Sequence, residues 1–290
     1  MSIRVYIDGR VVRPEDARIS VFDRGFLYGD SVYETIGTVG GRLFALEEHL
    51  TRLEGSAARL ALRLPTRAVI TKAIRDAIEA AGNPETRVRV VVTRGAGKLD
   101  LDPGSADEPQ LVVIAQPLGG PTPEMYSMGV TVAVVSVTRN IPGAIDPAIK
   151  SGNYLNNVLA LNEARQRGSG VHEAILCNAA GSIAEGATSN VFAVQGGELR
   201  TPALDVGILA GVTRAKVLDL AREAGVPCRE VGFMDPDELR GADEVFLTSA
   251  ARGVLPVTVV DSRKIGSGVP GSVTLRLMEL YRRLTHVGSG

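Results

Sequence analysis

The stretch IDPAIKSGNYLNNVLALNEA, from Ile145 to Ala164, places one lysine, Lys150, between an apolar segment and the start of a predicted helix. Burial lowers the pKa of an ammonium group readily, whereas a guanidinium stays charged, so lysine is the cation suited to losing its proton. Read alone, a lysine is more often a solvated surface residue. The chain uses arginine for almost every other cation, and its remaining lysines are Lys72, Lys98, Lys216 and Lys264.

The residues before this stretch predict hairpins, two helices and then strands. Strand-forming runs flank Asp8-Gly9 and Gly40-Gly41, dipeptides typical of tight hairpin turns. Apolar residues recur at spacings of three and four from Leu46 to Leu60, which is the period of an amphipathic helix. A second helix should run from about Thr66 to Ala81, and strands should follow at 87–93 and 110–116.

The residues around and after the stretch mix strands and helices without a regular strand–helix–strand repeat. Glycine and proline concentrate at LGGPTP (Leu118–Pro123), which marks a candidate interdomain linker. The irregular order favours an α+β fold over a doubly wound parallel sheet. We expect helices at 154–167, 211–224 and 272–284, and strands at 130–138, 173–178, 189–201 with a turn at Gly196-Gly197, 244–249 and 254–260.

Composition excludes several classes of function. The 290 residues carry a formal net charge of -1 without runs of like charge, so we expect no nucleic-acid partner. We expect no signal peptide and no membrane span, because polar residues interrupt every long apolar run. Cys177 and Cys228 lie far apart without metal-ligand spacing, which indicates no metal site and a reducing, cytoplasmic location. RGAGK (Arg94–Lys98) lacks the spacing of a phosphate-binding P-loop.

Three further segments suit ligand binding, each with a simpler alternative. Glu185 lies between small residues just before a predicted strand, where a carboxylate can face a ligand or simply form a turn. Gly211, Val212 and Thr213 open a predicted helix, where free N–H groups favour a phosphate or an ordinary helix cap forms. Arg52 lies on a mostly apolar helix, where a snorkelling arginine is the alternative.

Six motifs follow one another along the chain: FDRGFLYGDSVYETI (Phe22–Ile36), EEHLTRL, IKSGNYLNNVLALNEA, AEGATSNVF, LAGVTR (Leu209–Arg214) and FLTSAARGVLPV (Phe246–Val257). Taken together in this order, they resemble those of the class IV, or fold type IV, pyridoxal-phosphate enzymes. This group includes branched-chain aminotransferases, D-amino-acid aminotransferases, (R)-amine transaminases and aminodeoxychorismate lyases.

The resemblance implies two domains and a homodimer. A smaller N-terminal α/β sandwich domain would span 1–117 and a linker 118–124. A larger, β-barrel-like C-terminal domain with helices would span 125–290 and bind pyridoxal phosphate. The neighbouring subunit would complete the pocket with its FDRGFLYG segment or its Thr93–Pro103 loop.

The resemblance also assigns cofactor roles. Lys150 would form the Schiff base and move the proton, and Glu185 would keep a proton on the pyridine nitrogen. Tyr154 would donate to the ring oxygen, and Leu209 would pack on the ring. The phosphate would be bound by Arg52, Val212, Thr213, Ser249 and Ala250.

The substrate is less well indicated. IKSGNYLNNVLALNEA and TRGAGKLDLDP are most similar to branched-chain members, whereas AEGATSNVF and LTSAARGVLPV are more similar to D-amino-acid aminotransferases and the lyases. The first prediction is therefore a ping-pong aminotransferase for branched-chain L-amino acids and 2-oxoglutarate. The alternatives are a D-amino-acid or (R)-amine transaminase and aminodeoxychorismate lyase. Predicted substrate contacts are Tyr28, Tyr33, Arg89, Arg94, Ala251 and Arg252.

Two departures from the family pattern concern the substrate carboxylate. Gly37 stands where the family commonly has a cationic residue, and no histidine follows Arg94 as in the RxH pair of the D-amino-acid enzymes. Many branched-chain members read GTAAE where this chain has SAARG (Ser249–Gly253). Arg252 is therefore a hypothetical source of the missing positive charge.

Overall fold

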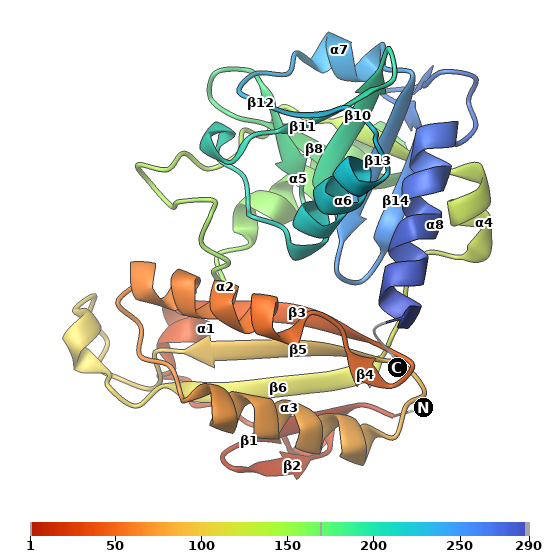
Figure 1. The fold of residues 1–290 in the computed structure, drawn as a ribbon. Helices are drawn as coiled ribbons and strands as arrows, with labels where there is room; N and C mark the ends of the chain where they lie inside the picture. Colours follow the sequence, from red (N-terminus) through yellow and green to blue (C-terminus); the bar gives the residue numbers. More distant parts are fainter. Residues whose placement is uncertain (1, 169, 288–290) are drawn as a thin grey trace. The chain divides into compact units, whose positions relative to one another are not determined.

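The computed structural model describes residues 2–168 and 170–287, and the side chains of all these except 286 and 287. The chain divides into two compact units, with the boundary between Gly119 and Gly120. The segment Ile149–Asn153 returns to the first unit. The second unit therefore consists of Gly120–Ala148 and Tyr154–Val287. Both units combine helices with sheets in which antiparallel pairs predominate (Figure 1), so the predicted α+β class is confirmed.

The first unit is an antiparallel sheet in the order β2-β1-β6-β5-β3-β4. Its strands are β1 (Arg4–Ile7), β2 (Arg10–Val12), β3 (Ser31–Val39), β4 (Arg42–Leu43), β5 (Thr86–Thr93) and β6 (Gln110–Pro117). Both predicted hairpin turns form, because Asp8, Gly9, Gly40 and Gly41 adopt the positive φ angles that such tight turns require. A short helix, α1 (Arg24–Tyr28), precedes β3 and was not predicted.

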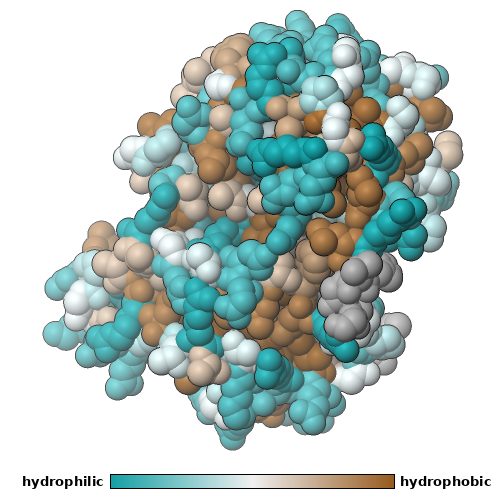
Figure 2. Space-filling view, in the orientation of Figure 1, coloured by the Kyte–Doolittle hydropathy of each residue, from teal (hydrophilic) through white to brown (hydrophobic). Residues whose placement is uncertain are grey.

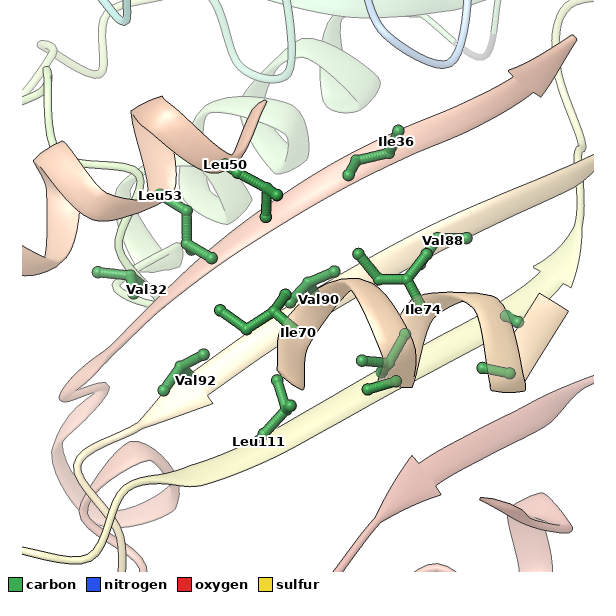
Figure 3. Packing of buried hydrophobic residues seen from close by; sticks show 14 of the residues in the cluster. Val32, Ile36, Leu50, Leu53, Ile70, Ile74, Val88, Val90, Val92 and Leu111 are labelled. Carbon is green, nitrogen blue, oxygen red and sulfur yellow. The ribbon is translucent and has the colours of Figure 1, made fainter. Parts of the chain in front are cut away.

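Helices α2 (Leu46–Arg59) and α3 (Arg67–Ala81) cover one face of this sheet (Figure 1). Their apolar sides pack on alternate strand residues, and Figure 3 shows Leu50, Leu53, Ile70 and Ile74 directed toward Val90 and its neighbours. Thr66 caps α3 through its side chain, and Gly82 ends it with a left-handed φ of 60°. Tyr33 and Arg89 lie on the opposite face of this sheet.

The second unit is built on a mixed sheet in the order β12-β11-β10-β13-β14-β7-β8-β9, with β15 paired to β14. Strand β9 also lies against β10 and β11, so the sheet curls into a half-barrel. The strands are β7 (Val130–Val134), β8 (Val171–Cys177), β9 (Ile183–Gly186), β10 (Asn190–Gln195), β11 (Glu198–Pro202), β12 (Cys228–Val231), β13 (Glu244–Ser249), β14 (Gly253–Val260) and β15 (Arg263–Lys264). Its helices are α4 (Pro123–Met128), α5 (Leu155–Arg167), α6 (Val212–Glu223), α7 (Pro236–Arg240) and α8 (Ser272–Val287).

The division into units differs from the predicted domain ranges at two places. Helix α4 begins at Pro123, inside the predicted linker 118–124, because Thr122 caps it and proline suits a first helical turn. Residues 149–153, placed in the second domain by the prediction, belong to the first unit because their backbone pairs with β3: Ser151 bridges Val32.

Hydrophilic residues cover much of the visible surface of each unit, with hydrophobic patches among them (Figure 2). Within the described part of the chain, no helix is long and apolar enough to cross a bilayer.

Candidate active site

Lys150 is held in the first unit by its own backbone. Its carbonyl accepts a hydrogen bond from the Tyr33 N–H (3.0 Å), and its N–H donates to Ser56 Oγ (3.1 Å). These bonds tie the lysine to β3 and to α2, which belong to the same unit. The Lys150 Nζ lies 4.5 Å from the centroid of the Tyr33 ring, so the amine is positioned over an aromatic face.

A buried ion pair lies on the helix-covered side of β3. Both oxygens of Glu34 accept from Arg52, at 2.7 Å from Nε and 2.8 Å from Nη2, and His49 Nδ1 lies 2.8 Å from Glu34 Oε2. Burial alone raises the pKa of the Glu34 carboxyl, but Arg52, His49 and the Lys150 charge outweigh it and lower this pKa to about 2. Glu34 is therefore a permanent carboxylate that orients Arg52.

The opposite side of β3 presents Tyr33 beside Arg89 of β5. The Arg89 guanidinium carbon lies 4.0 Å from the Tyr33 ring centroid, and burial and the charge of Arg87 lower the pKa of Arg89. The structure pairs Arg89 with no carboxylate among the described residues. Arg89 therefore keeps its charge available for an anion near Tyr33 and Lys150.

The predicted substrate contact for Arg94 does not fit the geometry. Arg94 is buried, binds both oxygens of Asp30 at 2.7 and 3.0 Å, and donates to the carbonyls of Leu60 and Ala61. These bonds engage the guanidinium fork, so Arg94 fixes the loops around it. Tyr28 closes α1 with its ring under the Arg24 guanidinium, 5.0 Å away, and is half-buried.

In the second unit, Glu185 on β9 is a buried carboxylate that accepts hydrogen bonds from Arg139, Asn190 and Leu209. Its Oε1 accepts from Arg139 Nε (2.8 Å), and its Oε2 accepts from the Leu209 N–H (3.0 Å) and from Asn190 Nδ2 (3.3 Å). Asn190 also donates to the Leu209 carbonyl at 3.0 Å. The network fixes both the carboxylate and the loop that precedes α6.

Tyr154, at the start of α5, lies close enough to the Glu185 carboxylate for the charge of Glu185 to affect its pKa. Burial, together with the negative charges of Glu185 and Glu173, raises the pKa of the Tyr154 hydroxyl above its usual value near 10. The phenol therefore stays protonated and can donate a hydrogen bond at neutral pH.

The start of α6 offers backbone donors. Gly211 occupies the cap position, so no side chain caps the first N–H groups of the helix, which belong to Val212 and Thr213. A Cβ at Gly211 would collide with Asn190 Oδ1, so glycine is needed for this close approach. The Thr213 hydroxyl is buried, 3.5 Å from that of Tyr281.

Ser249 ends β13, and the turn that follows contains Ala250, Ala251 and Arg252. Arg252 donates through Nε to Ser249 Oγ (3.0 Å) and through Nη2 to Glu173 Oε2 (3.0 Å). Since the buried carboxylate of Glu173 neutralises Arg252, the hypothesis that Arg252 supplies a free charge to a substrate carboxylate does not fit. Ala251 is half-buried in the turn.

The donor and acceptor types fit a phosphorylated pyridine aldehyde. A helix start with uncapped N–H groups and a hydroxyl suits the phosphate, an ionised buried carboxylate suits a protonated ring nitrogen, and a lysine suits an aldehyde.

The structure adds four residues that sequence reasoning did not select: Glu34, His49, Arg139 and Asn190. Glu34, His49 and Asn190 lie inside the quoted motifs, whereas nothing in the local sequence marks Arg139 as the partner of Glu185.

Comparisons with known proteins identify the family of this chain. Residues 31–260 match the family described as amino-transferase class IV. A putative branched-chain-amino-acid aminotransferase of Methanocaldococcus jannaschii is 37% identical over 97% of this chain and 96% of its own length. A D-alanine aminotransferase of Bacillus licheniformis is 33% identical over 94% and 93%.

Solved structures give the same family. The branched-chain amino acid aminotransferase of Escherichia coli superposes with a TM-score of 0.92, at 31% identity over 98% of this chain and 95% of that chain. Another branched-chain amino acid aminotransferase, solved with pyridoxamine 5'-phosphate, gives a TM-score of 0.91 at 32% identity, over 98% and 94%. The chain therefore belongs to the class IV aminotransferases, a family of pyridoxal-phosphate-dependent enzymes, and is similar to their branched-chain amino acid aminotransferases.

Proposed function

We propose that the chain transfers the amino group of a branched-chain L-amino acid to 2-oxoglutarate, in a ping-pong course with Lys150 as the Schiff-base lysine. The observation that carries the proposal is Arg89, a guanidinium with no described carboxylate partner, next to Tyr33 and within the same unit as Lys150. An acidic acceptor brings a second carboxylate that needs such a cation. The named branched-chain relatives support the donor class.

The cofactor roles predicted from the sequence belong to this proposal. Pyridoxal phosphate, when bound, supplies an electron sink that stabilises negative charge at the substrate Cα. Glu185 holds a proton on the ring nitrogen, and Tyr154 donates to the ring oxygen. Leu209 packs on the ring. The proposed phosphate ligands are Val212 and Thr213 at the start of α6, Ser249 and Ala250, together with Arg52, whose Nε and Nη2 are held by Glu34.

Lys150 is the proposed general base and acid. As a neutral amine, Lys150 removes the proton from the substrate Cα. The resulting ammonium then donates a proton to C4′ of the cofactor. Its backbone bonds to Tyr33 and Ser56 anchor the main chain during that transfer.

A D-amino-acid transaminase is the second candidate, favoured by the D-alanine aminotransferase among the relatives. The structure supports it less, because Arg94 is fully committed to Asp30, Leu60 and Ala61. The (R)-amine transaminase and aminodeoxychorismate lyase are the further alternatives, and the lyase releases pyruvate without an amino acceptor.

Absorbance spectra of the pure protein with pyridoxal phosphate distinguish these functions. We expect L-leucine to convert the aldehyde form of the cofactor to the aminated form, and D-alanine and (R)-1-phenylethylamine to leave it unchanged. A response to D-alanine or the amine alone would contradict the proposed donor. Lys150→Ala should abolish turnover with every donor, and full activity of that variant would refute the role of Lys150.

A homodimer belongs to the same proposal. An exposed apolar cluster in the first unit comprises Val21, Phe22, Phe26, Leu99 and Leu101, of which Leu101 is 79% exposed. The hydrogen bonds from Arg24 N–H to the Gly95 carbonyl and from Gly97 N–H to the Phe22 carbonyl join the two segments that carry it. Exposed apolar side chains gathered on adjoining segments mark interfaces, and we assign this one to a second copy of the chain.

A further inference from the structure

We propose that Arg252 is a positioning residue that orients the Ser249 hydroxyl as a donor to the cofactor phosphate. This inference rests on the proposed function, in which Ser249 contacts that phosphate. It replaces the substrate-binding role predicted for Arg252 from the sequence.

Arg252 joins three parts of the second unit. Its Nε donates to Ser249 Oγ at the end of β13 (3.0 Å), and its Nη2 donates to Glu173 of β8 (3.0 Å) and to the Thr188 carbonyl (3.2 Å). Thr188 lies in the turn between β9, which carries Glu185, and β10, which carries Asn190. One planar guanidinium thus connects the Ser249 turn to the strands that hold the Glu185 network.

Glu173 fixes the orientation of this guanidinium. The carboxylate is 1% exposed and also accepts from Thr188 Oγ1 (2.6 Å) and Ser189 Oγ (3.3 Å). A buried carboxylate needs a counter-charge, so Arg252 cannot turn away without removing the positive charge that is paired with Glu173. The Arg252 fork is therefore locked with its Nε directed at Ser249.

The bond to Arg252 determines what the Ser249 hydroxyl can do. Its oxygen accepts from Nε, and within the described residues its own proton has no acceptor. A hydroxyl that accepts from a cation is polarised and becomes a stronger donor. Such a hydroxyl donates a stronger hydrogen bond to an anionic acceptor, such as a phosphate, than to a neutral acceptor.

Affinities for pyridoxal phosphate and for pyridoxal, which lacks the phosphate, test the inference by titration. Arg252→Met should weaken pyridoxal phosphate binding by about ten- to hundredfold and leave pyridoxal binding nearly unchanged. Ser249→Ala should do the same, and the double variant should bind no more weakly than Ser249→Ala, because Arg252 acts through Ser249. Arg240→Met, which removes another arginine of this unit paired with Asp237 and Asp261, should match the wild type.

A second variant, Arg252→Lys, serves if Arg252→Met does not fold. Lysine keeps a positive charge beside Glu173 but lacks the guanidinium Nε that donates to Ser249. This variant should lose phosphate-dependent affinity while remaining folded. Equal losses for both ligands, or additive effects in the double variant, would overturn the positioning role. A wild-type protein that does not prefer pyridoxal phosphate over pyridoxal would instead overturn the proposed function.

Discussion

At the scale of single residues, opposite sides of one strand carry different chemistry. Alternation along β3 directs Glu34 toward α2, where it binds Arg52 and His49, and directs Tyr33 to the other face with Arg89. The ion pair of Glu34 and Arg52 thus lies on the helix-covered face of the strand. Arg89, which has no described carboxylate partner, lies on the opposite face. These two arrangements lead to separate predictions.

Glu34→Gln should destabilise the protein by roughly 3 kcal/mol at neutral pH, because it leaves the partly buried Arg52 charge without its carboxylate. The pKa of Glu34 is lowered to about 2 by folding, so its ionisation stabilises the protein above its unfolded pKa near 4.5. That contribution is lost as the pH falls from about 4.5 toward about 2.

Urea unfolding at neutral pH and across this acidic range measures both effects. The wild type should lose stability more steeply than Glu34→Gln as the pH falls. Glu47→Gln, which removes an exposed partner of Arg67, is the matched control and should cost much less. Identical acid slopes in the wild type and Glu34→Gln would contradict the assignment.

The Arg89→Met variant should bind acceptors with two carboxylates more weakly than the wild type does. We expect the KM for 2-oxoglutarate to rise by about tenfold or more, since a charged hydrogen-bond pair is lost, whereas the KM for 4-methyl-2-oxopentanoate changes little. Steady-state kinetics with both oxo acids measure the split. A proportional loss with both acceptors would remove Arg89 from substrate recognition.

At the scale of elements, the start of α6 is set by its contact with β10. Gly211 approaches Asn190 so closely that a Cβ would collide with its amide oxygen, and Asn190 in turn holds Glu185 and Leu209. The helix start and the carboxylate are therefore positioned together by one amide side chain.

Gly211→Ala should weaken pyridoxal phosphate binding by about tenfold or more, because either the first turn of α6 or the Asn190 amide must move. Gly232→Ala is the control, since a Cβ there meets no atom within 4 Å. Titration with the cofactor compares the two variants. Wild-type affinity in Gly211→Ala would show that this contact does not position the phosphate site.

At the scale of the whole molecule, the exposed cluster around Phe26 and Leu101 predicts self-association. Leu101→Asp should shift the protein from dimer to monomer in light scattering, because it places a charge in an apolar interface. Val69→Asp, an exposed apolar position of α3 outside the cluster, should leave the dimer intact. A monomeric wild type, or an unchanged Leu101→Asp dimer, would refute the interface.

The sequence by itself determined those elements whose signals are local. Turn dipeptides located both hairpins, apolar periodicity and capping residues located α2 and α3, and the ordered motifs identified the family. Short elements such as α1, β9 and β12 were missed because they contain too few residues to establish a period. The motifs also supplied the candidate lysine, carboxylate and helix start.

Only the tertiary structure decided which charges are paired. Arg89, Arg94 and Arg252 are equal candidates in the sequence, yet Asp30 engages Arg94, Glu173 engages Arg252, and Arg89 has no described carboxylate partner. The same holds for Arg139, whose partner Glu185 is 46 residues away along the chain. Whether a cation is available to a ligand depends on partners brought together by folding, and such long-range pairing leaves no periodic trace in the sequence.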